Sequence, residues 1–179
     1  MRTIFLIALL ASIMVTSYAQ ETKKAIKQNV ERNKNIDTKV GYNYFMLDMV
    51  RDLDVIYTEY EELVQRVWDK KVNLNLKNSS SESIKKVDAL RKMMIDMPVY
   101  KGGDDYQKSV LIYADVVKKK IKILEKYGVL GADPNSDTTE YYDAKRAFDE
   151  VTNLEIEKRN AVRRMKSAYE KTVYLNTGK

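Results

Sequence analysis

The amino-acid sequence predicts an all-α protein whose single core domain, residues 38–176, is a four-helix bundle in up-down-up-down order. Four segments, two long and two shorter, carry apolar residues at helical spacing, and short connections with turn-forming residues separate them. The 179 residues include neither histidine nor cysteine, so disulfides and zinc sites cannot stabilise the fold. The helices must therefore hold together by packing their apolar faces.

The first 19 residues have the three parts of a secretory signal peptide. Arg2 supplies the positive charge, residues 4–15 form an apolar run, and Ser17 and Ala19 place small residues at the −3 and −1 positions of a cleavage site. The run is shorter than the roughly 20 residues that a membrane span needs. We therefore expect cleavage between Ala19 and Gln20, and export to the periplasm or cell surface of a bacterium, with no transmembrane segment in the mature chain.

Residues 20–37 are polar and rich in Lys and Asn, and they predict either a frayed helix or a flexible arm. Removal of residues 1–19 takes away one arginine and no acidic residue, so the net charge falls from +6 to +5. Both signs of charge are interleaved along the chain, as is typical of the solvated surface of a helical protein.

The first long helix is expected over residues 38–71. Its apolar residues alternate at distances of three and four positions, the spacing with which a helix presents one face to its neighbours. They are Met46, Met49, Leu53, Ile56, Tyr60, Leu63 and Val67. Further apolar residues widen this face, which indicates a helix that contacts two neighbours in a bundle. These are Phe45, Val50, Tyr57, Val64 and Trp68.

The second and shorter helix is expected to begin at Ser79, which forms a capping box with Glu82, and to end before Pro98. Residues 72–79 alternate between apolar and polar side chains and are interpreted as a connecting loop. The predicted buried face of this helix consists of Ile84, Val87, Leu90, Met94 and Met97.

The third helix is expected to begin at Asp104 or Asp105 and to end at Tyr127, with Gly128 as a left-handed C-cap. Its predicted buried face consists of Tyr106, Val110, Tyr113, Val117, Ile121, Leu124 and Tyr127.

The fourth helix is expected over residues 138–176, with Asp137 and Glu140 as a capping pair at its start. Its apolar face is interrupted by Glu155 and Lys158. The apolar residues are Tyr141, Phe148, Val151, Leu154, Val162, Met165, Tyr169 and Val173.

The absent residue types exclude most catalytic and metal chemistry. Without histidine and cysteine the chain has no Ser-His-Asp triad, no thiolate nucleophile and no di-iron site of the Glu-x-x-His kind. Carboxylates, lysines and tyrosines are present, but no acid pair differs from ordinary surface charge. We therefore expect no enzyme, no cofactor and no metal. The alternative is a periplasmic small-ligand carrier or a carboxylate-dependent enzyme.

One loop has the beginning of a calcium-binding pattern. Asp133, Asn135 and Asp137 have the spacing of the first three ligands, but Thr138 stands in the position of the glycine and Ala144 in that of the bidentate glutamate. We interpret the loop as a turn that leads into a helix cap. Three methionines that could bind copper(I) have helical spacing and are assigned to the core. They are Met93, Met94 and Met97.

Two groups of basic residues and several tyrosine pairs are candidate binding surfaces. The basic side of the third helix is expected to consist of Lys118, Lys119, Lys120, Lys122 and Lys126, and that of the fourth helix of Arg159, Arg163, Arg164 and Lys166. We interpret both as solvated faces, with binding of an anionic surface as the alternative. The tyrosine pairs Tyr42/Tyr44, Tyr57/Tyr60 and Tyr141/Tyr142 are expected at half-buried helix edges, with binding of a glycan or a protein as the alternative. Nucleic acid is not an expected partner of an exported protein.

The chain resembles a family of small secreted helical proteins of spirochaetes and Bacteroidota, the leptospiral-type surface proteins of unknown function. The resemblance rests on Tyr42 and Asn43 at the start of the first long helix, on residues 100–106 before the third helix, and on the long last helix. It implies an exported helical bundle and transfers no functional residue. Together with the signal peptide, it leads us to expect a non-catalytic envelope or surface interaction module whose partner is unknown: an envelope protein, a glycan or an anionic surface.

Overall fold

The computed structural model describes residues 38–70 and 74–174, which form four helices and no strand. The helices are α2 (Lys39–Trp68), α3 (Leu76–Asp96), α4 (Asp104–Ala132) and α5 (Thr138–Tyr174). The expected all-α four-helix bundle is thereby confirmed. The predicted signal peptide with its Ala19 and Gln20 cleavage site, the polar segment 20–37 and residues 175–176 of the last helix lie outside the described residues.

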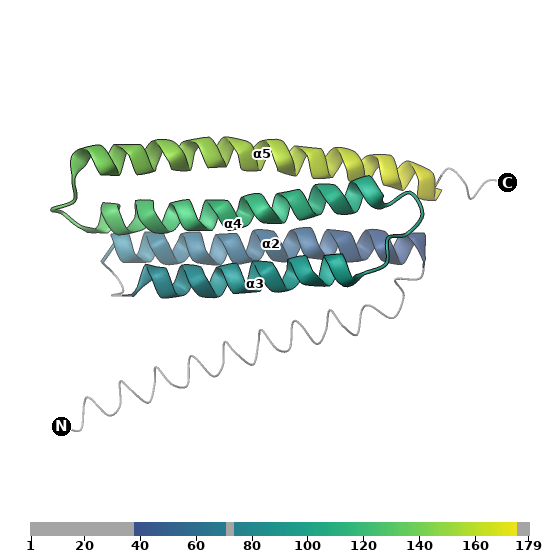
Figure 1. Cartoon of the computed structure of the whole chain (residues 1–179), viewed down its shortest axis with the longest axis horizontal. Helices are drawn as coiled ribbons and strands as arrows, with labels where there is room; N and C mark the ends of the chain where they lie inside the picture. The colour runs from purple at the N-terminus through teal and green to yellow at the C-terminus, as the bar shows by residue number, and fades with distance from the viewer. Residues whose placement is uncertain (1–37, 71–73, 175–179) are drawn as a thin grey trace, which may run out of the picture.

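Successive helices run in opposite directions, so the order is up-down-up-down (Figure 1). Helix α4 is central because it packs extensively against each of the other three helices, α5 included. Helix α5 packs along α4 and approaches α2 much less closely, so the bundle is a layered arrangement in which α4 separates α5 from α3. Side chains rather than close backbone approach must therefore fill the space between α2 and α5.

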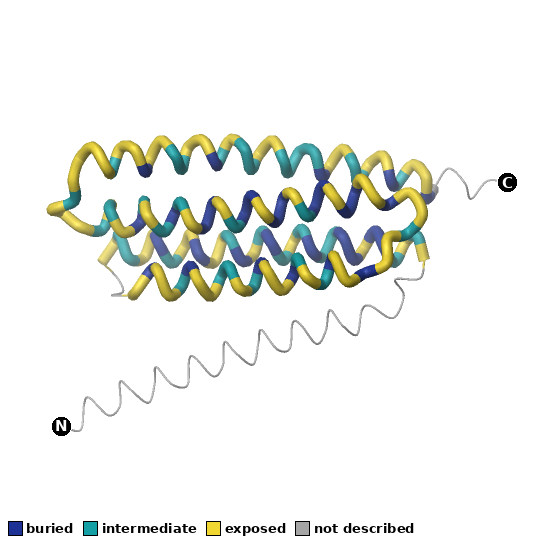
Figure 2. The backbone as a smooth tube through the Cα atoms, in the orientation of Figure 1, coloured by how far each residue is buried: buried dark blue, intermediate teal, exposed yellow. Residues whose placement is uncertain are grey.

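The core follows the predicted apolar faces. Met46, Met49 and Leu53 of α2 are fully buried, as are Val110 and Ile121 of α4. Figure 2 shows buried positions recurring along α2 and α4, with the outer sides of α3 and α5 exposed. Helix α2 begins one residue later than predicted, because Thr38 is its N-cap and accepts a hydrogen bond from the backbone N–H of Gly41 at 2.9 Å.

The predicted start of the second helix is wrong. Helix α3 begins at Leu76, and its N-cap is Asn75, whose side-chain oxygen accepts a hydrogen bond from the N–H of Asn78 at 3.2 Å. The extra turn is stabilised by tertiary packing, because Leu76 is only 3% exposed. The hydroxyl of Tyr60 also donates to the Leu76 carbonyl at 3.3 Å. Burial of one leucine therefore outweighs the local capping signal at Ser79.

The two candidate caps can be separated by mutation. We expect Asn75→Ala to lower the free energy of unfolding by about 1 kcal/mol, the usual value of an N-cap. The matched variant Ser79→Ala, within the first turn of the helix, is expected to change stability by less than about 0.5 kcal/mol. Urea unfolding followed by circular dichroism measures both, and the reverse order of effects would restore the capping box as the helix start.

The predicted end of the third helix is also wrong. Gly128 is not a left-handed cap, because α4 continues through it to Ala132. A Cβ at Gly128 would lie 2.9 Å from Val64 Cγ1 and 3.0 Å from Leu76 Cδ1, closer than carbon atoms normally pack. Gly128 therefore allows three helices to meet closely, and the connection to α5 shortens to residues 133–137.

Candidate functional site

A cluster of polar and charged side chains lies where α2, α4 and α5 meet, with Lys120 and Glu155 enclosed and Asp54 and Arg159 partly exposed. Lys120 is 5% exposed, and its Nζ lies 3.5 Å from Glu155 Oε2 and 4.1 Å from the ring centroid of Tyr57. The face of the Tyr57 ring is electron-rich and attracts the Lys120 ammonium group, so Tyr57 adds a cation–π contact to the ion pair. We call this group the Lys120 cluster: Asp54 and Tyr57 of α2, Tyr113 and Lys120 of α4, and Glu155 and Arg159 of α5.

Tyr113 joins the two carboxylates of the Lys120 cluster. Its hydroxyl lies within hydrogen-bond distance of both Asp54 and Glu155 Oε1, the latter at 3.1 Å, and donates its one proton to either. Burial, and then the hydrogen bond to Asp54, raises the pKa of Tyr113 well above the usual range of a phenol. Arg159 closes the network from α5 by pairing with Asp54. The tyrosine therefore stays protonated and acts as a fixed donor.

The charges of the Lys120 cluster balance, since two carboxylates face one lysine and one arginine. Lys120 is thus not part of a solvated basic side, and that part of the sequence-based prediction is wrong. Glu155, which interrupts the apolar face of α5 in the sequence, is the partner of Lys120, and its side chain is 13% exposed. Such a network sets the position of α5 relative to α2 and α4, because a charge buried between the helices is stable only when it faces its partner.

A second group consists of aromatic rings at the end of the bundle where α5 begins. The ring centroid of Tyr127 lies 5.1 Å from Trp68, 5.4 Å from Tyr141 and 5.6 Å from Phe148. Trp68 also donates from Nε1 to the Gly128 carbonyl at 2.8 Å. The four rings pack against one another and come from α2, α4 and α5. Together they occupy space between α2 and α5, whose backbones do not approach closely.

Most of the fully buried tyrosines lie on the predicted apolar faces of the helices. Tyr42, which was expected at a half-buried edge, is fully buried, and the predicted burial of Tyr60, Tyr106, Tyr113 and Tyr169 on the apolar helix faces is confirmed. Most of their hydroxyls reach backbone or side-chain partners inside the bundle. Tyr44 and Tyr142, in contrast, are more than half exposed and lie near the starts of α2 and α5. The described tyrosines therefore serve mainly as core residues.

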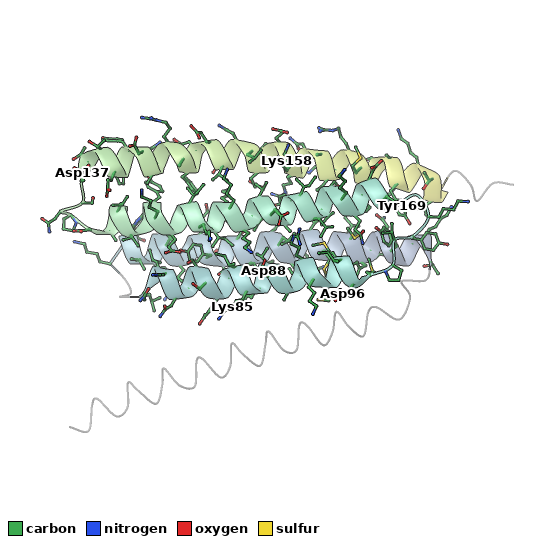
Figure 3. The ribbon with its side chains drawn as sticks, in the orientation of Figure 1. Lys85, Asp88, Asp96, Asp137, Lys158 and Tyr169 are labelled. Atoms are coloured by element: carbon green, nitrogen blue, oxygen red, sulfur yellow. The ribbon has the colours of Figure 1, made fainter. Side chains whose placement is uncertain are left out.

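Lysines gather on the outer face formed by α3 and α4. We call this set the lysine face: Lys77, Lys85 and Lys92 of α3, and Lys108, Lys119, Lys122 and Lys126 of α4. All seven are exposed, and none forms an ion pair within residues 38–70 and 74–174. Lys85, labelled in Figure 3, lies on the outer side of α3.

Two ion pairs cross the lysine face and neutralise their own charges. Lys118 Nζ lies 2.7 Å from Asp88 Oδ1, and Arg91 Nε lies 2.9 Å from Asp115 Oδ1. These pairs connect α3 to α4, and the two helices together carry 11 basic and seven acidic residues, a net charge of +4 (11 − 7). Helix α2, in contrast, carries six acidic and three basic residues. Charge is therefore unevenly distributed over the surface.

The residues of the failed calcium pattern cap backbone groups. Asp133 Oδ1 accepts from the Asn135 N–H and Asp137 Oδ1 from the Glu140 N–H, both at 2.9 Å, which confirms the predicted cap at the start of α5. The described part of the chain contains no group of three or more acidic side chains placed to hold a metal ion. Met94 and Met97 are buried in the core and Met93 packs against it.

The fold and these surfaces define an all-α four-helix bundle with a charge-balanced cluster between three of its helices and a lysine-rich outer face. No family model, curated protein or solved structure matches the chain. None of the described helices is long and apolar enough to cross a membrane. The segments that carry the family resemblance meet at one end of the bundle, where the Tyr42 hydroxyl donates to the Gly103 carbonyl at 3.2 Å.

Proposed function

We propose that the protein is an exported, non-catalytic interaction module of a bacterial envelope, and that its lysine face binds a negatively charged envelope surface. The observation that carries this proposal is the set of seven exposed lysines without ion-pair partners among the described residues. The net excess of positive charge on α3 and α4 produces a local positive potential that attracts anionic surfaces and orients the molecule toward them.

The charges of the Lys120 cluster are paired with one another, whereas the lysines of the outer face are exposed. This contrast favours a binding function over a catalytic one. The charged groups of the Lys120 cluster contact one another, and Lys120 itself is almost completely enclosed. The lysines of the outer face have long side chains free to adapt to a partner. A carrier or an enzyme, the alternative class, would instead use groups that converge on a bound small molecule.

The proposal is tested with the expected mature chain, residues 20–179, and two anionic probes: immobilised heparin and vesicles that contain phosphatidylglycerol. We expect binding to at least one probe, weakened by salt because the contact is electrostatic. The variant Lys119→Glu/Lys122→Glu/Lys126→Glu should lose this binding. The control Arg163→Glu/Arg164→Glu/Lys171→Glu makes the same charge change on exposed positions of α5 and should retain it.

Two results would contradict the proposal. Equal losses in both triple variants would mean that net charge alone governs the interaction, and binding to neither probe would remove the anionic partner.

Native mass spectrometry adds a separate check, because a stoichiometric small molecule on the purified protein would favour the carrier. Export is checked by N-terminal mass spectrometry of cell fractions, where retention of Met1 on cytoplasmic protein would exclude it.

A further inference from the structure

The lysine face also carries exposed aliphatic side chains. Ile95 of α3 is 53% exposed, and Ile112 and Val129 of α4 are 40% and 50% exposed. Single exposed apolar residues are common on protein surfaces. These three, however, lie on the same two helices as the lysine face. Binding by charge alone would not require exposed aliphatic side chains there.

The register of α3 and α4 brings two of the aliphatic residues to the same level. Arg91 pairs with Asp115, and the helices are antiparallel. Ile95 lies one turn after Arg91 and Ile112 lies about one turn before Asp115, so both lie at the same end of the pair of helices. Lys92 and Lys108 flank them there, and at the other end Val129 lies within one turn of Lys126. Each end of the face thus combines aliphatic and cationic side chains.

The face is long and is formed by two antiparallel helices. Helices α3 and α4 pack against each other, and within residues 38–70 and 74–174 the lysines of their outer side are exposed (Figure 1). Helix α4 has 29 residues, which corresponds to about 43 Å. A surface of this length suits an extended, flat partner more than a small ligand.

We propose that the partner of the lysine face is the anionic surface of a lipid bilayer, on which the protein lies as a peripheral module. This inference rests on the proposed function and narrows it. The ammonium groups contact lipid phosphates, and the three aliphatic side chains enter the boundary between headgroups and acyl chains. An acidic polysaccharide offers the same negative charge, but it would leave Ile95, Ile112 and Val129 in water. The aliphatic residues therefore favour the bilayer.

The inference is tested by cosedimentation of residues 20–179 with vesicles of phosphatidylcholine, with and without phosphatidylglycerol. We expect binding only to the anionic vesicles. The variant Lys119→Glu/Lys122→Glu/Lys126→Glu should bind them at least roughly a hundredfold more weakly. Each lysine near an anionic surface raises the affinity about fivefold, and reversal of its charge roughly doubles the free-energy change. The variant Ile95→Ser/Ile112→Ser should lose several-fold, whereas Val55→Ser, an exposed position on acidic α2, should change nothing. Circular dichroism confirms that each variant is folded.

Insertion is measured directly with a single fluorescent label. The chain has no cysteine, so Ile112→Cys provides one attachment site for an environment-sensitive dye. We expect a blue shift of its emission on anionic vesicles and no shift for the same dye at Val55→Cys. Binding to heparin without binding to vesicles would overturn the bilayer inference and leave the proposed function standing, whereas binding to neither would overturn both. Vesicle binding with no shift at position 112 would also overturn it.

Discussion

Replacement of Lys120 by methionine is expected to lower the free energy of unfolding by about 3 kcal/mol, because it leaves the Glu155 carboxylate inside the bundle without its cation. The cost of breaking a buried ion pair is usually about 3–5 kcal/mol. The lower end applies here because the Glu155 side chain is 13% exposed and still accepts from the Tyr113 hydroxyl at 3.1 Å. Loss of the cation–π contact to Tyr57 adds a smaller penalty.

A second variant distinguishes the missing charge from missing volume. Lys120→Met/Glu155→Gln removes both charges of the pair, and the glutamine carbonyl can still accept from the Tyr113 hydroxyl. We expect this double variant to recover stability to within about 1 kcal/mol of the wild type. Urea unfolding followed by circular dichroism measures the stability of the single and the double variant. Equal losses in the single and double variants would show that Lys120 contributes packing and not charge compensation.

Leu53→Asp is expected to unfold the protein, with a loss of about 5 kcal/mol or more. Leu53 has no exposed surface and lies in the middle of the buried face of α2. The substitution removes the burial of a leucine side chain, worth about 2–5 kcal/mol, and adds a carboxylate that must be desolvated without a partner. The sum is comparable with the whole stability of a typical domain, about 5–15 kcal/mol.

The control for Leu53→Asp lies two positions away on the same helix. Val55 is 47% exposed, so Val55→Asp makes the same charge change on the solvent side. It should change the free energy of unfolding by less than about 0.5 kcal/mol. A helical circular dichroism spectrum and a cooperative unfolding transition for Leu53→Asp would contradict the position of Leu53 in the core.

The apolar spacing was sufficient to predict the helices because each helix must bury one continuous face. Met46, Met49 and Leu53 follow the three-and-four spacing and are all fully buried. The cap at Asp137 was also predictable, since its hydrogen bond to the Glu140 N–H is local in the chain. Apolar periodicity was therefore a reliable guide, whereas of the local cap signals only Asp137 was correct and those at Ser79 and Gly128 were overridden by packing.

Predictions that depend on neighbours in space failed at identifiable residues. Gly128 has the composition signal of a helix end, but its small size is required by Val64 and Leu76, which lie far away in the chain. Lys120 sits in a run of lysines, and the run suggests a solvated side. A signal was nevertheless present, because Lys120 follows Tyr113 by seven positions and so belongs to the buried face of α4. Its partner Glu155 likewise follows Phe148 by seven positions.

The sequence by itself determined the class of the fold, the order of the described helices and most of the residues in their core. These follow from periodicity and local caps, which act within a few residues of each position. Only the tertiary structure decided which lysine of residues 118–126 turns inward and which remain as the lysine face. The physical reason is that a buried charge is stable only opposite a partner, and the partner Glu155 lies 35 positions away, on a helix brought alongside by the bundle.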